Sequence, residues 1–258
     1  MPDDIDKQCI RLRFARSLDT YAAAATVQRE MARRLVEELV AATGQRIFPR
    51  VAEAGCGTGV LTGLVERHLG YSRLFLFDLV PECARLHQER RHATFVAGDI
   101  EQLPLPGQLD LFIANAVFQW MRDLPGLLRR IAAALRPGAI LAFTTFGPQN
   151  LREIAAITGK GLCYPGIPEW KQLLAAGDFQ LLASAGRLQQ LFFDSPIDAL
   201  RHLKDTGVNA TANSRPWSRR QLEDFAGQYR QRFGNPGQGS VPLTYHPLSF
   251  VARRGPIS

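Results

Sequence analysis

A glycine-rich turn gives the strongest indication of how this chain folds. The turn follows a short apolar run and opens a helical pattern, and its sequence is Glu53-Ala54-Gly55-Cys56-Gly57-Thr58-Gly59. Glycine is needed where a backbone turns tightly and approaches a ligand closely, because a side chain would occupy the ligand's place. Taken alone, the turn predicts a nucleotide-binding site between a strand and a helix.

The spacing of the glycines argues against a dinucleotide. A dinucleotide fingerprint reads G-x-G-x-x-G, whereas Gly59 comes one residue early and the acidic Glu53 stands two residues before the first glycine. A carboxylate at that place would repel a pyrophosphate but would attract an ammonium group. We therefore expect a ligand with a methionine moiety.

The pattern around the turn is an alternation of strands and helices. Apolar runs that predict strands lie at 51–54, 74–77, 94–97, 109–114 and 140–145, and helical patterns lie between them at 58–69, 81–90 and 124–135. This order predicts an α/β fold, Rossmann-like, with a mostly parallel seven-stranded sheet and helices on both faces.

Further elements flank this core. Before it, Val27, Met31, Leu35 and Leu39 form one apolar stripe of a helix over 21–42. After it we expect helices at 149–158, 169–176, 196–204 and 218–233, a strand pair at 179–183 and 187–193, a turn-rich segment at 207–216 and a last strand at 243–252. The predicted units are a helical cap (1–45), the core (46–195), a helical lid (196–240) and the last core strand with the tail (241–258).

Carboxylates follow the predicted strands in order. Asp78 ends the second strand, where an acid can accept both hydroxyls of a ribose. Asp99 follows the third strand, with Ile100 beside it as an apolar floor for an adenine ring, and Asn115 ends the fourth. The ends of these strands meet at one edge of the sheet, where open α/β sheets bind ligands.

This ordered set resembles the class I S-adenosylmethionine-dependent methyltransferases over residues 45 to 146. The resemblance implies that the glycine turn contacts the methionine part, that Asp78 holds the ribose and that Asp99 holds the adenine. It implies S-adenosylmethionine as cofactor, S-adenosylhomocysteine as product and no metal. The cofactor residues predicted in this way are Glu53, Gly55, Cys56, Gly57, Asp78, Leu79, Asp99, Ile100 and Asn115.

Several strings outside the turn narrow the class of methyltransferase. They are 13–21, 27–32, Phe118-Gln119-Trp120, Leu135-Arg136-Pro137-Gly138, 143–147, Leu203-Lys204-Asp205-Thr206-Gly207 and 242–245. Together they resemble the malonyl-(acyl-carrier protein) O-methyltransferases of biotin synthesis, although Glu53 replaces the usual aspartate and 163–166 lacks a polar string common in relatives.

The second resemblance implies methyl transfer to the free carboxylate of a malonyl thioester on acyl carrier protein, which gives the methyl ester that primes pimeloyl and biotin synthesis. A carboxylate has a pKa of about 4, so it is ionised at neutral pH and its attack on a sulfonium methyl requires no general base. The enzyme must orient the oxygen and exclude water. The residues predicted to do this are Tyr21, Gln119, Trp120, Arg152 and Lys204.

The basic surplus fits an acidic partner. Lysine and arginine outnumber aspartate and glutamate 31 to 24, which gives a formal net charge of +7. Acyl carrier proteins are acidic, so the later helical zone is predicted to dock one. Its basic residues are Arg201, Lys204, Arg215, Arg219, Arg220, Arg230 and Arg232.

Several other classes are disfavoured. No apolar stretch is long enough for a membrane span and the first residues are acidic, which favours a cytoplasmic protein without a membrane partner. The four cysteines are scattered without a Cys-x-x-Cys, so neither a disulfide framework nor a zinc cluster is indicated. The string 115–118 lacks the Pro-Pro-aromatic motif of nucleic-acid amino-methyltransferases. Two alternatives stay open: another small acceptor, such as a quinone precursor or a free acid, and a non-catalytic cofactor-binding partner protein.

Overall fold

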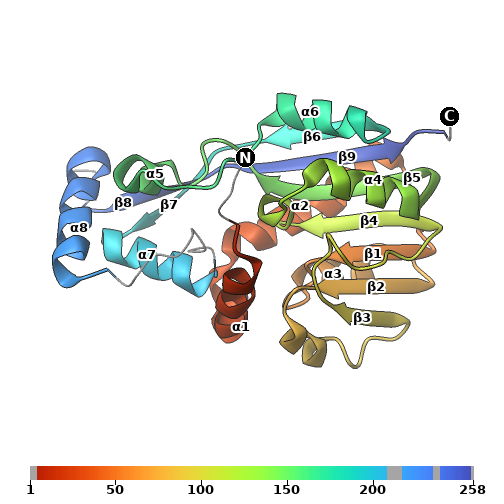
Figure 1. Ribbon diagram of the computed structural model, residues 1–258, viewed down its shortest axis with the longest axis horizontal. Coiled ribbons are helices and arrows are strands. Elements are labelled where there is room, and N and C mark those ends of the chain that lie inside the picture. The colour runs from red at the N-terminus through yellow and green to blue at the C-terminus, as the bar shows by residue number, and fades with distance from the viewer. Residues whose placement is uncertain (1–4, 208–216, 235–238, 257–258) are drawn as a thin grey trace.

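The computed structural model describes residues 5–207, 217–234 and 239–256. Its core is a seven-stranded sheet in the order β3-β2-β1-β4-β5-β9-β6, in which the first five strands along this row are parallel and β9 is antiparallel to both of its neighbours (Figure 1). The predicted fold class is confirmed. The strands are β1 (Arg50–Ala54), β2 (Arg73–Asp78), β3 (Ala93–Ala97), β4 (Leu109–Asn115), β5 (Leu135–Phe146), β6 (Phe179–Gly186) and β9 (Pro247–Arg254).

Helices cover both faces of the sheet because side chains along a buried strand alternate in direction. Leu111 and Ile113 of β4 pack with α2 (Thr26–Thr43) and α3 (Val60–His68). Phe112 of β4 packs on the opposite side with α4 (Leu124–Ala134) and α6 (Ile167–Ala176). The near-continuous apolar runs of the sequence thus correspond to strands buried on two sides.

A smaller unit lies beside the core, at the left of Figure 1. It consists of α5 (Arg152–Thr158), α7 (Pro196–Asp205) and α8 (Arg219–Phe233), together with β7 (Gln189–Phe193) and β8 (Val241–Tyr245), which pair with each other. The predicted helices at 196–204 and 218–233 match α7 and α8. Most of the turn-rich segment predicted at 207–216 lies outside the described residues.

Two strand predictions were wrong. The runs at 179–183 and 187–193 do not pair with each other, since β6 pairs with β9 and β7 with β8. The single last strand predicted over 243–252 is two strands that meet at His246. An apolar run cannot reveal the residue at which a chain leaves one sheet and enters another, because both strands bury the same kinds of side chain.

The N-terminal region also differs from its prediction. Instead of one helix over 21–42 there are two, α1 (Lys7–Ala24) and α2, which are separated at Ala25. In Figure 1, α1 stands beyond the carboxyl ends of β1 and β2, whereas α2 packs against the sheet. The helix predicted at 81–90 is only a 3-10 helix at Pro81–Leu86. Within the described ranges, no helix has the length and apolar character of a membrane span.

Candidate functional site

A cleft with an empty volume of about 1040 Å³ opens at the carboxyl ends of β1, β2, β3 and β4. This is the edge at which the sequence predicted a ligand. Its wall includes Gly55, Cys56, Gly57, Asp78, Leu79, Asp99, Ile100 and Asn115 from the core, and Lys7, Ile10, Phe14, Leu18 and Tyr21 from α1.

The glycine turn has a backbone that only glycine adopts readily. Gly55, Gly57 and Gly59 have φ angles of +67°, +47° and +83°. A Cβ atom on Gly55 would lie 2.2 Å from Cγ2 of Val117, which follows β4. The turn therefore needs glycine for its conformation and, at Gly55, also for the close approach of a neighbouring loop.

Asp78 connects the turn to the next strand. Its Oδ2 accepts a hydrogen bond from the backbone N–H of Gly57 (2.7 Å), and its Oδ1 accepts one from the N–H of Val80 (2.8 Å). Burial raises the pKa of this carboxyl, although both backbone hydrogen bonds oppose the rise. Each carboxylate oxygen keeps a lone pair that could accept a ribose hydroxyl.

Glu53 lies beneath the turn and does not contribute to the cleft wall that the described residues form. It is fully buried, and burial raises its pKa to about 8. The hydroxyl of Thr62 is near enough to offset part of this rise, but neither Glu53 oxygen has a hydrogen bond of normal geometry from a described residue. The hydroxyls of Thr58 and Thr62 are likewise unsatisfied.

Unsatisfied buried carboxylate oxygens are costly, so a donor is expected near them. The ammonium group of a methionine moiety has the right charge and hydrogen-bonding character. The acceptor oxygens beneath the glycine turn therefore fit the ammonium end of S-adenosylmethionine.

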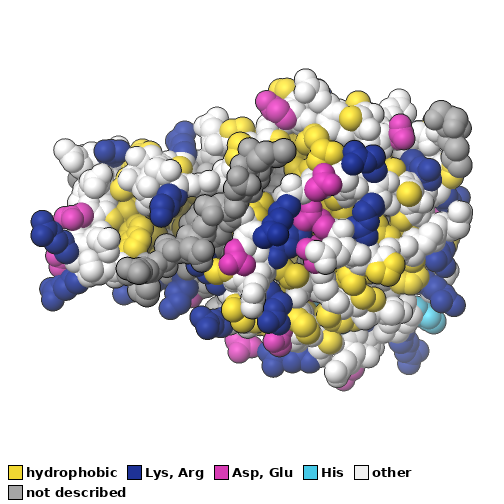
Figure 2. Space-filling view, in the orientation of Figure 1, with side chains coloured by type: hydrophobic (Ala, Val, Ile, Leu, Met, Phe, Trp, Pro, Cys, Tyr) yellow, Lys and Arg dark blue, Asp and Glu magenta, His cyan; other side chains and the backbone are white. Residues whose placement is uncertain are grey.

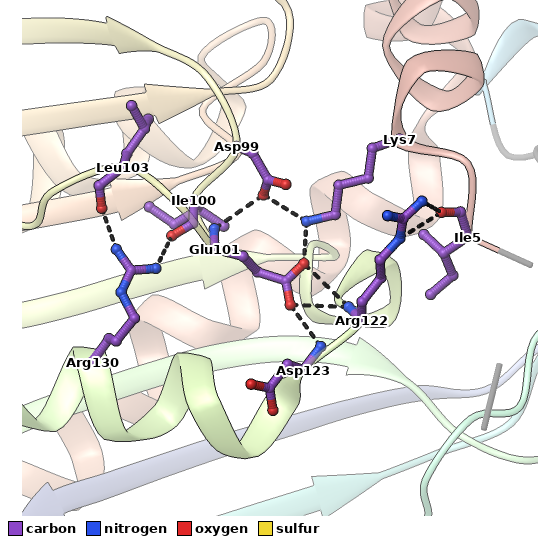
Figure 3. A network of polar contacts seen from close by, with 9 residues as sticks. All are labelled: Ile5, Lys7, Asp99, Ile100, Glu101, Leu103, Arg122, Asp123 and Arg130. Carbon is purple, nitrogen blue, oxygen red and sulfur yellow. Dashed lines mark hydrogen bonds and ion pairs between the residues drawn. The ribbon is translucent and has the colours of Figure 1, made fainter. Parts of the chain in front are cut away.

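Asp99 is already engaged by a residue that the sequence did not indicate. Lys7 Nζ lies 2.5 Å from Asp99 Oδ1 and also contacts Glu101 Oε2 (Figure 3). Lys7 stands 92 residues before Asp99 in the chain. Nothing in the local sequence around a single lysine in a helix indicates that it will contact so distant a carboxylate. Ile100 lies beside Asp99 in the wall, as an apolar floor requires.

Asn115, the last residue of β4, is held in the cleft wall by hydrogen bonds to α2 and β5. Its Nδ2 donates to the carbonyl of Gln28 in α2 (3.1 Å), and its Oδ1 accepts from the Thr144 hydroxyl in β5 (2.7 Å). Ala116, the next residue, has a φ of +54°. The strand exit is therefore held in an unusual conformation directly at the cleft.

Of the residues predicted to orient an acceptor, Tyr21 and Trp120 line the cleft. Burial, with a smaller contribution from Asp78, raises the pKa of the Tyr21 hydroxyl far above its usual value, so the group stays protonated and is a hydrogen-bond donor at physiological pH. The Trp120 ring meets Phe14 edge to face at 6.0 Å. Together they give this side of the cleft an aromatic wall with one hydroxyl.

The other three predicted residues lie elsewhere. Gln119 stands behind the wall, where its Nε2 donates to the carbonyl of Ala116 (2.7 Å). Arg152 begins α5, with 48% of its side chain exposed and its guanidinium beside Gln149 and Glu153. Lys204 is exposed in the last turn of α7. Contact of these three residues with an acceptor stays a prediction.

Comparison with known proteins yields matches along nearly the whole chain. A methyltransferase domain model matches residues 52–143. A malonyl-(acyl-carrier protein) O-methyltransferase of Chlorobium phaeovibrioides is 40% identical over 256 residues, covering 96% of this chain and 97% of that protein. The enzyme of the same name from Porphyromonas gingivalis is 38% identical, covering 97% of each.

Among solved structures, an S-adenosylmethionine-dependent methyltransferase from Mesorhizobium loti aligns with a TM-score of 0.53. The alignment covers 84% of this chain and 96% of that one at 18% identity. At this identity the likeness concerns the fold, and it agrees with the seven-stranded sheet described above.

Proposed function

The chain belongs to the malonyl-(acyl-carrier protein) O-methyltransferase family, and from this premise we propose that it methylates the free carboxylate of malonyl-acyl carrier protein with S-adenosylmethionine. The product is the malonyl methyl ester that primes pimeloyl and biotin synthesis. The observation that supports the proposal is a cleft whose wall includes the glycine turn, Asp78 and Asp99, the groups proposed to hold the methionine, ribose and adenine parts of the cofactor.

The cofactor would be held by groups of different chemistry. A Cβ on Gly57 would meet only a backbone oxygen at 4.0 Å, so this glycine leaves room for the methionine part. The unsatisfied oxygens of Glu53 can accept hydrogen bonds from the ammonium group, and the positive charge of that group favours the ionised form of Glu53. Asp78 and Asp99 are acceptors for the ribose hydroxyls and the adenine amine. When bound, the cofactor supplies an electrophilic methyl group on a sulfonium.

The acceptor needs orientation more than activation. Its carboxylate is ionised at neutral pH, so no side chain has to remove a proton. Tyr21 can donate a hydrogen bond to one carboxylate oxygen and leave the other free to attack in line. Phe14 and Trp120 keep water from this end of the cleft, which strengthens such a hydrogen bond.

The carrier would dock on residues 196–240, the predicted lid. Figure 2 shows basic side chains around the end of the molecule formed by α7 and α8. Arg201 pairs with Asp198 (2.6 Å) and Arg219 with Glu223 (2.9 Å). Within the described residues, Lys204, Arg220 and Arg230 have no ion pair, and Arg215 lies outside them. These cations suit an acidic protein surface.

The proposal is tested by incubating the protein with S-adenosylmethionine and malonyl-acyl carrier protein, malonyl-coenzyme A or free malonate, with methyl incorporation read by mass spectrometry. We expect methylation of the carrier-bound malonyl group. Methylation of a quinone precursor or a free acid instead would overturn the acceptor and leave the cofactor standing. Cofactor binding without methylation of any acceptor would indicate a non-catalytic partner protein.

A further inference from the structure

We propose that Lys7 is a positioning residue for the cofactor. Through Asp99 and Glu101 it fastens α1 over the adenine end of the cleft, and it directs the Asp99 carboxylate at the same time. The inference rests on the proposed function, because it assigns the adenine of S-adenosylmethionine to this end.

One side of the fastening is a rigid turn after β3. Arg130 of α4 donates to the carbonyls of Ile100 (2.8 Å) and Leu103 (Figure 3). The Glu101 carboxylate accepts from the backbone N–H groups of Arg122 (3.0 Å) and Asp123 (2.7 Å). The turn is thus held from the core side by groups that do not belong to α1.

The other side is the first turn of α1. Lys7 Nζ reaches both Asp99 and Glu101, and the Arg122 guanidinium donates to the carbonyl of Ile5 (2.8 Å). These contacts join a helix near the N-terminus to two loops that lie about a hundred residues later in the chain (Figure 3). Lys7 is the charged member of this junction that α1 itself supplies.

Burial distinguishes this ion pair from others. The side chains of Lys7, Asp99 and Glu101 are 13%, 17% and 13% exposed. A second ion pair links α1 to the core, Asp19 with Arg85 at 3.3 Å, but its side chains are 92% and 60% exposed. Exposed pairs contribute little because water and salt screen them, so the Lys7 contacts have the larger effect.

Lys7 lies on the face of α1 that lines the cleft. Ile10, Phe14, Leu18 and Tyr21 follow it at helical spacing, and all four line the cleft. A shift of the first turn of α1 therefore moves the part of the cleft wall that this helix supplies.

Lys7 also acts on Asp99 directly. Lys7 Nζ and the N–H of Glu101 (3.0 Å) both bind Asp99 Oδ1, which leaves Oδ2 for the exocyclic amine of adenine. Without the ammonium group, Asp99 and Glu101 would be adjacent carboxylates with no cation between them, and repulsion would turn Asp99 away. Lys7 thus couples closure of α1 to the orientation of the adenine acceptor.

The test compares Lys7→Met, Lys7→Arg and the matched control Arg85→Met in the full-length protein. Dissociation of S-adenosylhomocysteine is followed by stopped flow, and its affinity by calorimetry. We expect dissociation about tenfold faster for Lys7→Met, since losing a desolvated charge pair acts mainly on the dissociation rate. Lys7→Arg should stay near wild type, and Arg85→Met within about twofold of it.

Two further readouts separate positioning from a general structural effect. The faster dissociation from Lys7→Met should persist at high salt, because salt screens a buried ion pair much less than an exposed one. In turnover, the KM for the cofactor should rise with kcat retained. Glu101→Gln leaves Lys7 paired with Asp99, so S-adenosylhomocysteine should dissociate from it at a rate between those of the wild type and Lys7→Met. If Lys7→Met does not fold, Glu101→Gln takes its place in the test.

Equal dissociation rates for Lys7→Met and Arg85→Met would overturn the inference, as would an unchanged rate for Glu101→Gln. Failure of the wild type to bind S-adenosylhomocysteine would instead overturn the proposed function. The two failures are therefore distinguishable in one set of measurements.

Discussion

The carboxylate of Asp78 and the backbone N–H of Gly57 are joined by a hydrogen bond of 2.7 Å, so the acid proposed to hold the ribose also holds the turn proposed to hold the methionine. In Asp78→Asn, one of the two N–H groups at Gly57 and Val80 would face an amide NH₂. We expect a loss of about 1–3 kcal/mol in unfolding free energy and at least roughly tenfold weaker cofactor binding. Calorimetry and urea unfolding measure both; the exposed Asp19→Asn is the control. Unchanged stability would contradict the coupling.

A side chain at Gly55 is expected to destabilise the fold through backbone strain and through a steric clash. A second glycine with the same φ angle but no close neighbour separates the two effects. Gly44 at the end of α2 has the same φ, +67°, but a Cβ there would meet no atom within 4 Å, whereas at Gly55 it would meet Val117. Gly44→Ala should cost about 1–2 kcal/mol from backbone strain alone. Gly55→Ala should cost a further ~1–3 kcal/mol from the clash, partly recovered by Val117→Ala. Equal costs in denaturant unfolding would remove the steric argument.

Glu53 should make stability depend on pH in the absence of cofactor. Its pKa rises from 4.5 to about 8, so between these pH values the folded chain keeps a proton that the unfolded chain releases. Stability therefore falls as pH rises through this window, with a slope of up to ~1.4 kcal/mol per pH unit. Glu53→Gln should flatten the curve. Parallel unfolding curves for the two proteins from pH 5 to pH 8 would show that Glu53 does not titrate in this way.

Tyr21 should affect the acceptor more than the cofactor. Its buried hydroxyl is protonated because its pKa lies far above the usual value, so Tyr21→Phe removes a hydrogen-bond donor and little volume. We expect kcat for malonyl-carrier protein to fall by about tenfold or more, with cofactor affinity within about twofold. Tyr71→Phe is the control, since that hydroxyl faces Glu66 away from the cleft. A change in cofactor affinity as large as that in kcat would contradict the assignment.

The basic face of α8 should matter only for the carrier. Arg219→Glu with Arg220→Glu should raise the KM for malonyl-carrier protein, more strongly at low salt, and leave turnover of malonyl-coenzyme A unchanged. Arg220→Glu with Arg230→Glu is expected to act more strongly, because Arg219 already pairs with Glu223. Arg67→Glu on α3 is a remote control. Equal kinetics of all variants with the carrier substrate would place docking elsewhere.

The parts of the fold that the sequence predicted are those that local chemistry specifies. The glycine turn followed from a backbone requirement and the five parallel strands from apolar runs. Four of these strands begin and end within one residue of their predictions, whereas β5 begins five residues earlier than predicted. Asp78 and Asp99 were expected at the cleft because acids at the carboxyl ends of parallel strands reach the same edge of the sheet, and both line the cleft. The residues that orient the acceptor were harder to predict. Lys204 was chosen from a string that resembles the family and Arg152 from its place in a predicted helix near the cleft, and neither lines the cleft.

What the sequence could not predict depends on contacts between distant segments. The break at Ala25 separates two helices, because α1 lines the cleft and α2 packs against the sheet. An apolar pattern in the sequence does not indicate which of these two surfaces a helix will cover. The change of sheet at His246 has the same origin. Lys7 is the clearest case, since its partners stand 92 and 94 residues away.

The place where the smaller unit, apart from α5, joins the core has a consequence for protein engineering. The chain leaves the core at Gly186, which pairs with Leu248, and the N–H of Arg187 donates to the carbonyl of Pro247 (3.1 Å). The two ends of the segment 187–246 thus touch, the geometry in which whole units can be exchanged without disturbing their host. A graft of this segment between relatives, matched to Glu153 where it meets Thr244, should transfer carrier preference while the recipient's cofactor affinity is inherited unchanged.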